Sequence, residues 1–224
     1  DGWSAAFFAI ASLAPSVLGS TANAEHFVLL PAMAGAFCLW DPKGWKQCLV
    51  GGLCMGLAVT MKQQGVFFAG FGFVWLLFKL DSKISLWNPK GFFASLRMTA
   101  LLAYLAGVFL PLAGMFVWME MSGTFGNFWF WCFDYARNYG GMWGWGEGLQ
   151  HFWFKFKSVL LDHAPVFALG LFGCLAAWKR NRNAFWFVMG LTATGFMATA
   201  PGLIFRPHYF IFILPGVALA AAMG

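Results

Sequence analysis

The sequence predicts an all-α protein built as a bundle of membrane helices, and three observations lead to this prediction. Of the 224 residues, 61% are hydrophobic and only 10% are charged, and the mean hydropathy of +0.70 exceeds that of soluble domains. The apolar residues form long runs separated by short polar turns. The 28 Phe and 13 Trp residues suit lipid-facing helices and aromatic belts at membrane surfaces. The lipid bilayer is therefore the first partner that we expect.

Seven or eight membrane helices are expected, together with an outer segment at the membrane interface. The apolar segments are 3–19, 24–40, 47–61, 66–80, 98–119, 164–178, 184–200 and 209–224. Several are shorter than the ~20 residues of a full span, so we expect tilted, short or partly interfacial helices. We interpret residues 1–224 as a single transmembrane domain whose outer loop covers about residues 121–163. Because both ends look cut, we interpret the chain as an internal piece of a longer polytopic protein.

A polar step at Lys62 divides the stretch from Gln47 to Leu80. As one helix this stretch would measure ~51 Å, well beyond the ~30 Å hydrocarbon core. A lysine at the centre of a span would also cost ~2.5–3.5 kcal/mol. Two short helices joined by a turn avoid both problems. We therefore expect Lys62, Gln63 and Gln64 at one membrane surface.

The distribution of charge predicts the orientation of these helices. Alternating the spans places nine basic residues on one side: Lys43, Lys46, Lys79, Lys83, Lys90, Arg97, Lys179, Arg180 and Arg182. The other side receives Lys62, Arg137, Lys155, Lys157 and Arg206, with most of the acidic residues. The positive-inside rule makes the first side cytoplasmic. Asn88, Pro89 and the Pro42–Gly44 region then mark cytoplasmic turns, and the polar clusters lie outside the cytoplasm.

Two of the outer clusters could bind a phosphate. Lys62 is a compact cation with two amides beside it, although a snorkelling lysine that anchors a helix end has the same pattern. Arg206 precedes Pro207, His208 and Tyr209. An arginine can hold a phosphate through two hydrogen bonds, but an Arg/Tyr pair is also a common interfacial anchor.

A third cluster is Asn23, Glu25 and His26, at the start of the second apolar segment. A carboxylate beside an imidazole could orient a sugar hydroxyl or transfer a proton. The alternative is an ordinary helix start, with Asn23 as the N-cap and Glu25 favourable to the helix dipole.

The fourth cluster is the outer segment, which has fourteen aromatic residues between Phe125 and Phe156, interspersed with Asp134 and Arg137. This pattern predicts at least one short helix lying along the membrane plane. The glycines at 140, 141, 144 and 146 suggest a flexible hairpin or lid.

The remaining residue types exclude several functions. The five cysteines form no Cys-x-x-Cys pair, and no histidine has the helical i, i+4 partner of a zinc site. No metal site is predicted; a divalent ion shared by Glu25, His26 and His208 is left open without support. The net charge of +6 lies at helix ends, so a nucleic acid is not an expected partner. A Gly-rich nucleotide loop is also missing from the sequence.

Three segments in order resemble one enzyme family. They are Ala22–Phe27, Gly56–Gly65, which ends in Lys62-Gln63-Gln64-Gly65, and Arg206–Phe210 ahead of Leu214-Pro215. The set resembles the bacterial polyprenyl-phosphate-sugar-dependent glycosyltransferases, relatives of the protein O-mannosyltransferases and the lipid A aminoarabinose transferase. The resemblance implies the GT-C fold. It also implies a site on the extracytoplasmic face of the bacterial inner (plasma) membrane.

The same resemblance implies transfer of a sugar from a polyprenyl-phosphate donor to an acceptor outside the cytoplasm. It places the catalytic acid in an outer loop ahead of this chain, which leaves Glu25 as a fallback candidate. No cofactor is implied. The main alternative is a secondary transporter or lipid flippase without bond chemistry, whose ionisable residues would line a pathway. A scaffold protein of the cell envelope is a third option.

Overall fold

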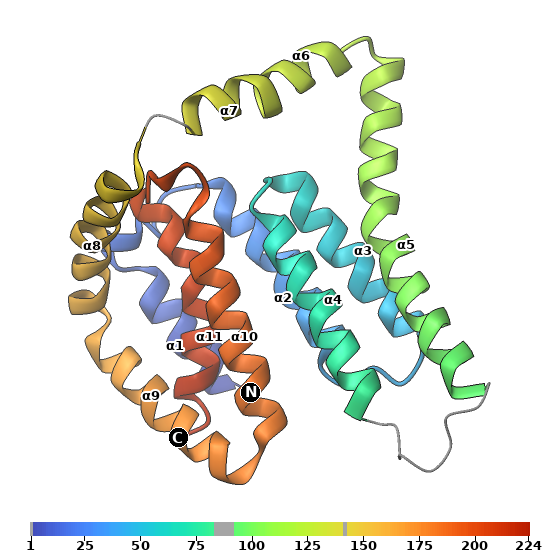
Figure 1. The fold of residues 1–224 in the computed structure, drawn as a ribbon. Coiled ribbons are helices and arrows are strands. Elements are labelled where there is room, and N and C mark those ends of the chain that lie inside the picture. Colours follow the sequence, from blue (N-terminus) through green and yellow to red (C-terminus); the bar gives the residue numbers. More distant parts are fainter. Residues whose placement is uncertain (1, 83–91, 141–142) are drawn as a thin grey trace. The chain divides into compact units, whose positions relative to one another are not determined.

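The computed structural model is helical throughout the parts of the chain that it describes (Figure 1). It describes the backbone of residues 2–82, 92–140 and 143–224, and the side chains of these residues outside 81–97 and 139–142. Within these ranges no strand is present, which confirms the all-α prediction. Lys83, Asn88, Pro89 and Lys90, which the orientation argument used, lie outside the described residues.

The helices follow the predicted apolar segments closely. In chain order they are α1 (Gly2–Ser12), η1 (Pro15–Val17), α2 (Ala24–Trp40), α3 (Trp45–Met61), α4 (Gly65–Ser82), α5 (Phe92–Met121), α6 (Phe125–Trp129), η2 (Phe130–Asp134), α7 (Tyr135–Gly140), α8 (Trp145–Asp162), α9 (Ala164–Arg180), α10 (Arg182–Thr199), η3 (Pro201–Leu203), η4 (Pro207–Ile213) and α11 (Leu214–Ala221). Here η2 is a π-helical turn, and the other η elements are 3₁₀ helices. The predicted segment 3–19 is divided between α1 and η1, and the predicted segment 209–224 is divided between η4 and α11.

Only one described helix is long and apolar enough to cross a membrane by itself. It is the part of α5 from Met98 to Met121, and 22% of its apolar stretch is buried. The core helix of a soluble protein would be mostly buried. Helices α8 and α9 pass the same test as a pair, but they meet at an angle of 86°. The expected seven or eight spans therefore remain a prediction, because several of the other apolar helices are shorter than a span.

The chain divides into two compact units, which we describe separately. Unit 1 contains residues 1–26 and 126–224, and unit 2 contains residues 27–125. In unit 2, α3 and α5 run side by side (Figure 1). A Cβ atom at Gly52 would overlap the carbonyl oxygen of Tyr104, and one at Gly56 would overlap that of Val108. The Gly52-x-x-x-Gly56 spacing thus allows α3 to pack closely against α5.

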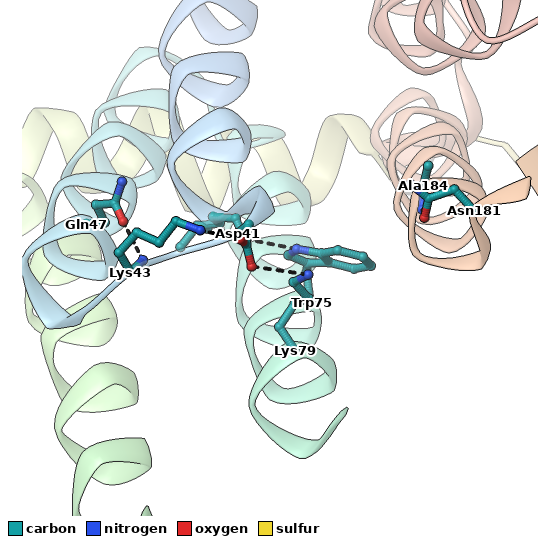
Figure 2. Close-up of polar contacts among 8 residues, drawn as sticks. Asp41, Lys43, Gln47, Trp75, Lys79, Asn181 and Ala184 are labelled. Carbon is teal, nitrogen blue, oxygen red and sulfur yellow. Dashed lines mark hydrogen bonds and ion pairs between the residues drawn. The ribbon is translucent and has the colours of Figure 1, made fainter. Parts of the chain in front are cut away.

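A charged and aromatic cluster closes one end of unit 2. The buried Lys79 has its Nζ atom 3.5 Å from Oδ1 of Asp41, which also pairs with Lys43 (Figure 2). The same Nζ atom lies 5.5 Å from the ring of Trp40 and 5.8 Å from that of Trp75. A buried cation requires such partners. Lys79 therefore joins the end of α2 to the end of α4.

In unit 1, α11 packs against α1, α9 and α10. Its approach to α9 depends on Gly173, where a Cβ atom would overlap the carbonyl oxygen of Ala220. The buried His163 occupies the corner between α8 and α9. Its Nε2 atom is 2.8 Å from the Ala11 carbonyl oxygen, and its Nδ1 atom is 2.7 Å from that of Val159. The ring thereby ties the α8–α9 corner to α1.

Replacing His163 by Leu is expected to lower the free energy of unfolding by about 1–3 kcal/mol, because a buried hydrogen bond to a carbonyl oxygen is lost. His151→Leu, within α8, is the matched control and should cost less. Thermal unfolding of the full-length protein in detergent measures both. Equal melting temperatures for wild type and His163→Leu would show that the contact to α1 contributes nothing.

Candidate functional site

Glu25 and His208 meet in unit 1, although 183 positions separate them in the sequence. Glu25 lies in the first turn of α2 and is 1% exposed. Its Oε1 atom is 3.8 Å from Nε2 of His208, whose side chain is 18% exposed. This distance suits an ion pair but is too long for a hydrogen bond. Two of the polar clusters that the sequence analysis placed outside the cytoplasm, those of Glu25 and His208, thus meet in unit 1.

The burial of Glu25 constrains its chemical role. A carboxylate that is 1% exposed cannot touch a large acceptor, whereas His208 is partly open. An ionised carboxylate is costly to bury without a partner. The geometry therefore favours Glu25 as a positioning residue for the imidazole of His208, which is the more exposed member of the pair.

The loop before Glu25 is held by its own hydrogen bonds. Thr21 Oγ1 donates to the carbonyl oxygen of Leu18 at 2.6 Å, and Asn23 Nδ2 donates to the same oxygen at 3.2 Å. His26 Nδ1 lies 3.3 Å from the carbonyl oxygen of Asn23. Asn23 and His26 thus brace the start of α2, which is closer to the helix-start interpretation of this cluster than to direct substrate contact.

Arg206 is the N-cap residue that precedes η4. It is exposed and has an extended backbone, and Pro207 follows as the first helical residue. The amide of Tyr209 donates to the Arg206 carbonyl at 2.9 Å. The ring of Tyr209 packs edge-on against that of His208, with centroids 5.0 Å apart. One short turn therefore presents a guanidinium, an imidazole and a phenol.

The Lys62 cluster lies in unit 2, at the turn between α3 and α4. The amide of Gly65 donates to the Lys62 carbonyl at 2.8 Å, which closes the turn. This confirms the predicted pair of short helices joined at Lys62. Lys62 is half-buried, Gln63 is exposed and Gln64 is buried. The buried Oε1 atom of Gln64 has no hydrogen-bond partner among the described residues. Such an orphaned atom costs free energy unless a ligand or water satisfies it.

The predicted site residues are therefore divided between the two units. Unit 1 holds Glu25, His208, Arg206 and Tyr209, and unit 2 holds the turn at Lys62. The pairing of Lys62 with Arg206 remains a prediction. Among the described residues, no three His, Cys, Asp or Glu side chains are placed to share a metal ion. The ion that Glu25, His26 and His208 were considered to share has no geometric support.

The described part of the outer segment contains the short helices α6 and α7, which fit the predicted short helix, and the longer α8. The orientation of the short helices along the membrane plane remains a prediction. Asp134 ends the π-helical turn η2 and Arg137 lies in α7, and both side chains are exposed. The suggested hairpin is corrected in part. Trp145 and Gly146 begin helix α8, because Oε2 of Glu147 accepts the Gly144 amide at 3.1 Å and caps the helix. Residues 141 and 142 lie outside the described residues.

A pocket that the sequence did not predict lies between η1 and α8 in unit 1. Its volume is about 470 Å³. Its polar lining comes from Ser16 of η1 and from Lys155, Lys157 and Ser158 of α8. Pro207, the residue before His208, is also part of its wall. The sequence signal was weak, since Lys155 and Lys157 stand among aromatic residues and Ser16 lies in an apolar run.

Comparison of the chain with protein-family models, with curated proteins and with solved structures found no match. The functional assignment therefore depends on the residues themselves.

Proposed function

We propose that this chain belongs to an integral membrane glycosyltransferase of GT-C type, with seven or eight membrane helices. It transfers a sugar from a polyprenyl-phosphate carrier to an acceptor on the outer face of the bacterial plasma membrane. One observation carries the proposal. The pairing of Glu25 with His208 joins the Ala22–Phe27 segment to the Arg206–Phe210 segment, and these are two of the three segments that resemble the family.

The proposed reaction breaks the bond between the sugar's anomeric carbon and the carrier's phosphate oxygen. That oxygen keeps the electron pair, and the acceptor hydroxyl forms the new bond to the anomeric carbon as it loses its proton to a carboxylate base. The residues assigned below act on the other side of the reaction, because fixed cations and hydrogen-bond donors stabilise the departing phosphate.

Arg206 and His208 are the donors that we assign to the phosphate in unit 1. Arg206 is exposed at the N-terminal end of η4, and His208 is paired with the buried carboxylate of Glu25. In unit 2, Lys62 is the residue that we assign to the carrier phosphate. It is a half-buried cation in a closed turn, followed closely by the orphaned amide oxygen of Gln64, which could accept a hydrogen bond from a sugar hydroxyl.

Donor binding tests these assignments. In the full-length protein, Lys62→Ala and Arg206→Ala are each expected to weaken binding of a polyprenyl-phosphate sugar by roughly 10- to 100-fold. The reason is that a charge-assisted hydrogen bond contributes about 1.5–3 kcal/mol. Lys62→Arg should restore only part of the affinity, since a planar fork replaces a point charge. Titration of purified variants with a fluorescent donor measures the effect.

The exposed residues Lys46 and Arg180 provide matched controls, because Lys46→Ala and Arg180→Ala remove the same charges elsewhere. Both controls should bind the donor like wild type. If Lys62→Ala and Arg206→Ala also do so, the carrier phosphate lies elsewhere. If the donor binds and crosses the bilayer with its sugar still attached, the transporter or flippase alternative replaces the enzyme.

A further inference from the structure

The pocket between η1 and α8 has the chemistry of an anion site. It is lined by two lysines and two serines, and none of its described lining residues is acidic. Lys155 and Lys157 are two residues apart on α8, and Ser158 follows directly. The Nζ atom of Lys155 lies 5.4 Å from the centroid of the Phe154 ring, which also lines the pocket. The two lysines give the described lining a net positive charge, which suits an anion.

Ser16 supplies a second, independent observation. Its Oγ atom is buried and has no hydrogen-bond partner among the residues that the structure describes. A buried hydroxyl without a partner is unusual in a folded protein and costs about 1–3 kcal/mol. Because Ser16 lines the same pocket as the two lysines, a ligand oxygen between them would satisfy its hydroxyl.

The apolar part of the lining indicates the kind of molecule that carries this anion. Phe154 and Leu161 line the pocket, yet they remain 74% and 65% exposed. The same helix also exposes Trp145 and Trp153. A helix that combines lysines with exposed aromatic and aliphatic side chains is typical of a membrane interface. A soluble anion would leave these apolar surfaces in water, whereas a lipid would cover them.

We propose that this pocket binds the phosphate headgroup of an anionic lipid. Lys155, Lys157 and the Ser16 hydroxyl donate to its phosphate oxygens, and Phe154 and Leu161 contact its glycerol and acyl portions. The site does not depend on the proposed glycosyltransferase activity, because it uses none of the residues assigned to the donor. Pro207 links the lipid pocket to the proposed donor site, because it forms part of the pocket wall and directly precedes His208.

Lipid retention by the full-length protein tests this site. The protein is exchanged into nanodiscs of phosphatidylcholine that contain a few per cent of fluorescent phosphatidic acid, and bound lipid is measured by energy transfer from tryptophan. Wild type should bind phosphatidic acid at least 10-fold more tightly than a phosphatidylcholine probe. The double variant Lys155→Ala/Lys157→Ala should lose about 10- to 100-fold of that affinity. Lys155→Arg/Lys157→Arg should retain it, because guanidinium also donates to phosphate.

The matched control is Lys46→Ala/Lys179→Ala, which removes two exposed lysines outside the pocket. Its affinity should equal that of wild type. The proposal is overturned if the pocket double variant binds like this control, or if wild type does not distinguish the two lipids. Displacement of the probe by millimolar inorganic phosphate would overturn the lipid assignment, since a soluble anion would then suffice.

Ser16→Ala separates ligand binding from folding. Removal of an unpartnered buried hydroxyl should leave the melting temperature of the lipid-free protein unchanged or slightly higher. The same change should weaken phosphatidic acid binding by about 3- to 10-fold, because one donor to the phosphate is lost. A lower melting temperature together with unchanged lipid affinity would show that the hydroxyl serves the fold and not a ligand.

Discussion

Glu25→Gln is expected to lower the rate of sugar transfer by about 10- to 100-fold. The change keeps the shape of the side chain but removes the charge that lies 3.8 Å from His208. Interactions with a charged partner contribute about 1.5–3 kcal/mol, which corresponds to this range of rates. Initial rates of sugar transfer measured in membranes show the effect.

Two comparisons separate this positioning role from a loss of folding. Glu120→Gln makes the same change on an exposed carboxylate of α5 and should leave transfer unchanged. His208→Gln should impair transfer as Glu25→Gln does, and the double variant should be little worse than either single variant, because the two residues act together. Full additivity of the two losses would contradict a shared role.

Gly107→Ala and Gly114→Ala are expected to have opposite effects, although both change one helix in the same way. A Cβ atom at Gly107 would overlap the backbone of α3 at Leu49 and Leu53, whereas nothing lies within 4 Å of one at Gly114. Overpacking costs about 1–3 kcal/mol. At the open site, alanine is the better helix former by about 0.5–1 kcal/mol.

Thermal unfolding in detergent distinguishes these cases. Gly107→Ala should melt well below wild type, and Gly114→Ala should melt at the same temperature or above it. Gly52→Ala, which approaches the same contact from α3, should behave like Gly107→Ala. Similar melting temperatures for Gly107→Ala and Gly114→Ala would show that α3 and α5 are not in close contact in the folded protein.

Much of the helical framework follows from the sequence because apolar runs and polar breaks are local signals. The turn at Lys62 was predictable, since a single helix through it would be too long and would bury a lysine. The Gly52-x-x-x-Gly56 contact was predictable from local spacing, because residues four apart share a helix face. Helix α8 was not predicted, because Glu147, Lys155 and Lys157 interrupt its apolar pattern and its glycines suggested a hairpin.

The candidate site was predictable in part, because alternation of the spans places the Glu25 and His208 clusters on one side of the membrane. The structure brings these two side chains to 3.8 Å from each other. The buried position of Glu25 could not be foreseen, because a carboxylate at a helix start is usually exposed. The pocket at Ser16 could not be predicted from the sequence either. Ser16 and the lining residues of α8 lie about 140 positions apart, and only tertiary packing places them together.

Release of free polyprenyl phosphate is the measurement that tests the central claim most directly. Membranes that contain the full-length protein and its natural acceptors are supplied with a radiolabelled polyprenyl-phosphate sugar, and both the freed carrier and the labelled acceptor are quantified. We predict that carrier release and acceptor labelling rise together with wild-type protein and fall together in Lys62→Ala, Arg206→Ala and Glu25→Gln. The assignment as a glycosyltransferase would be contradicted if the wild-type protein left the donor intact. It would also be contradicted if all three variants turned the donor over like wild type.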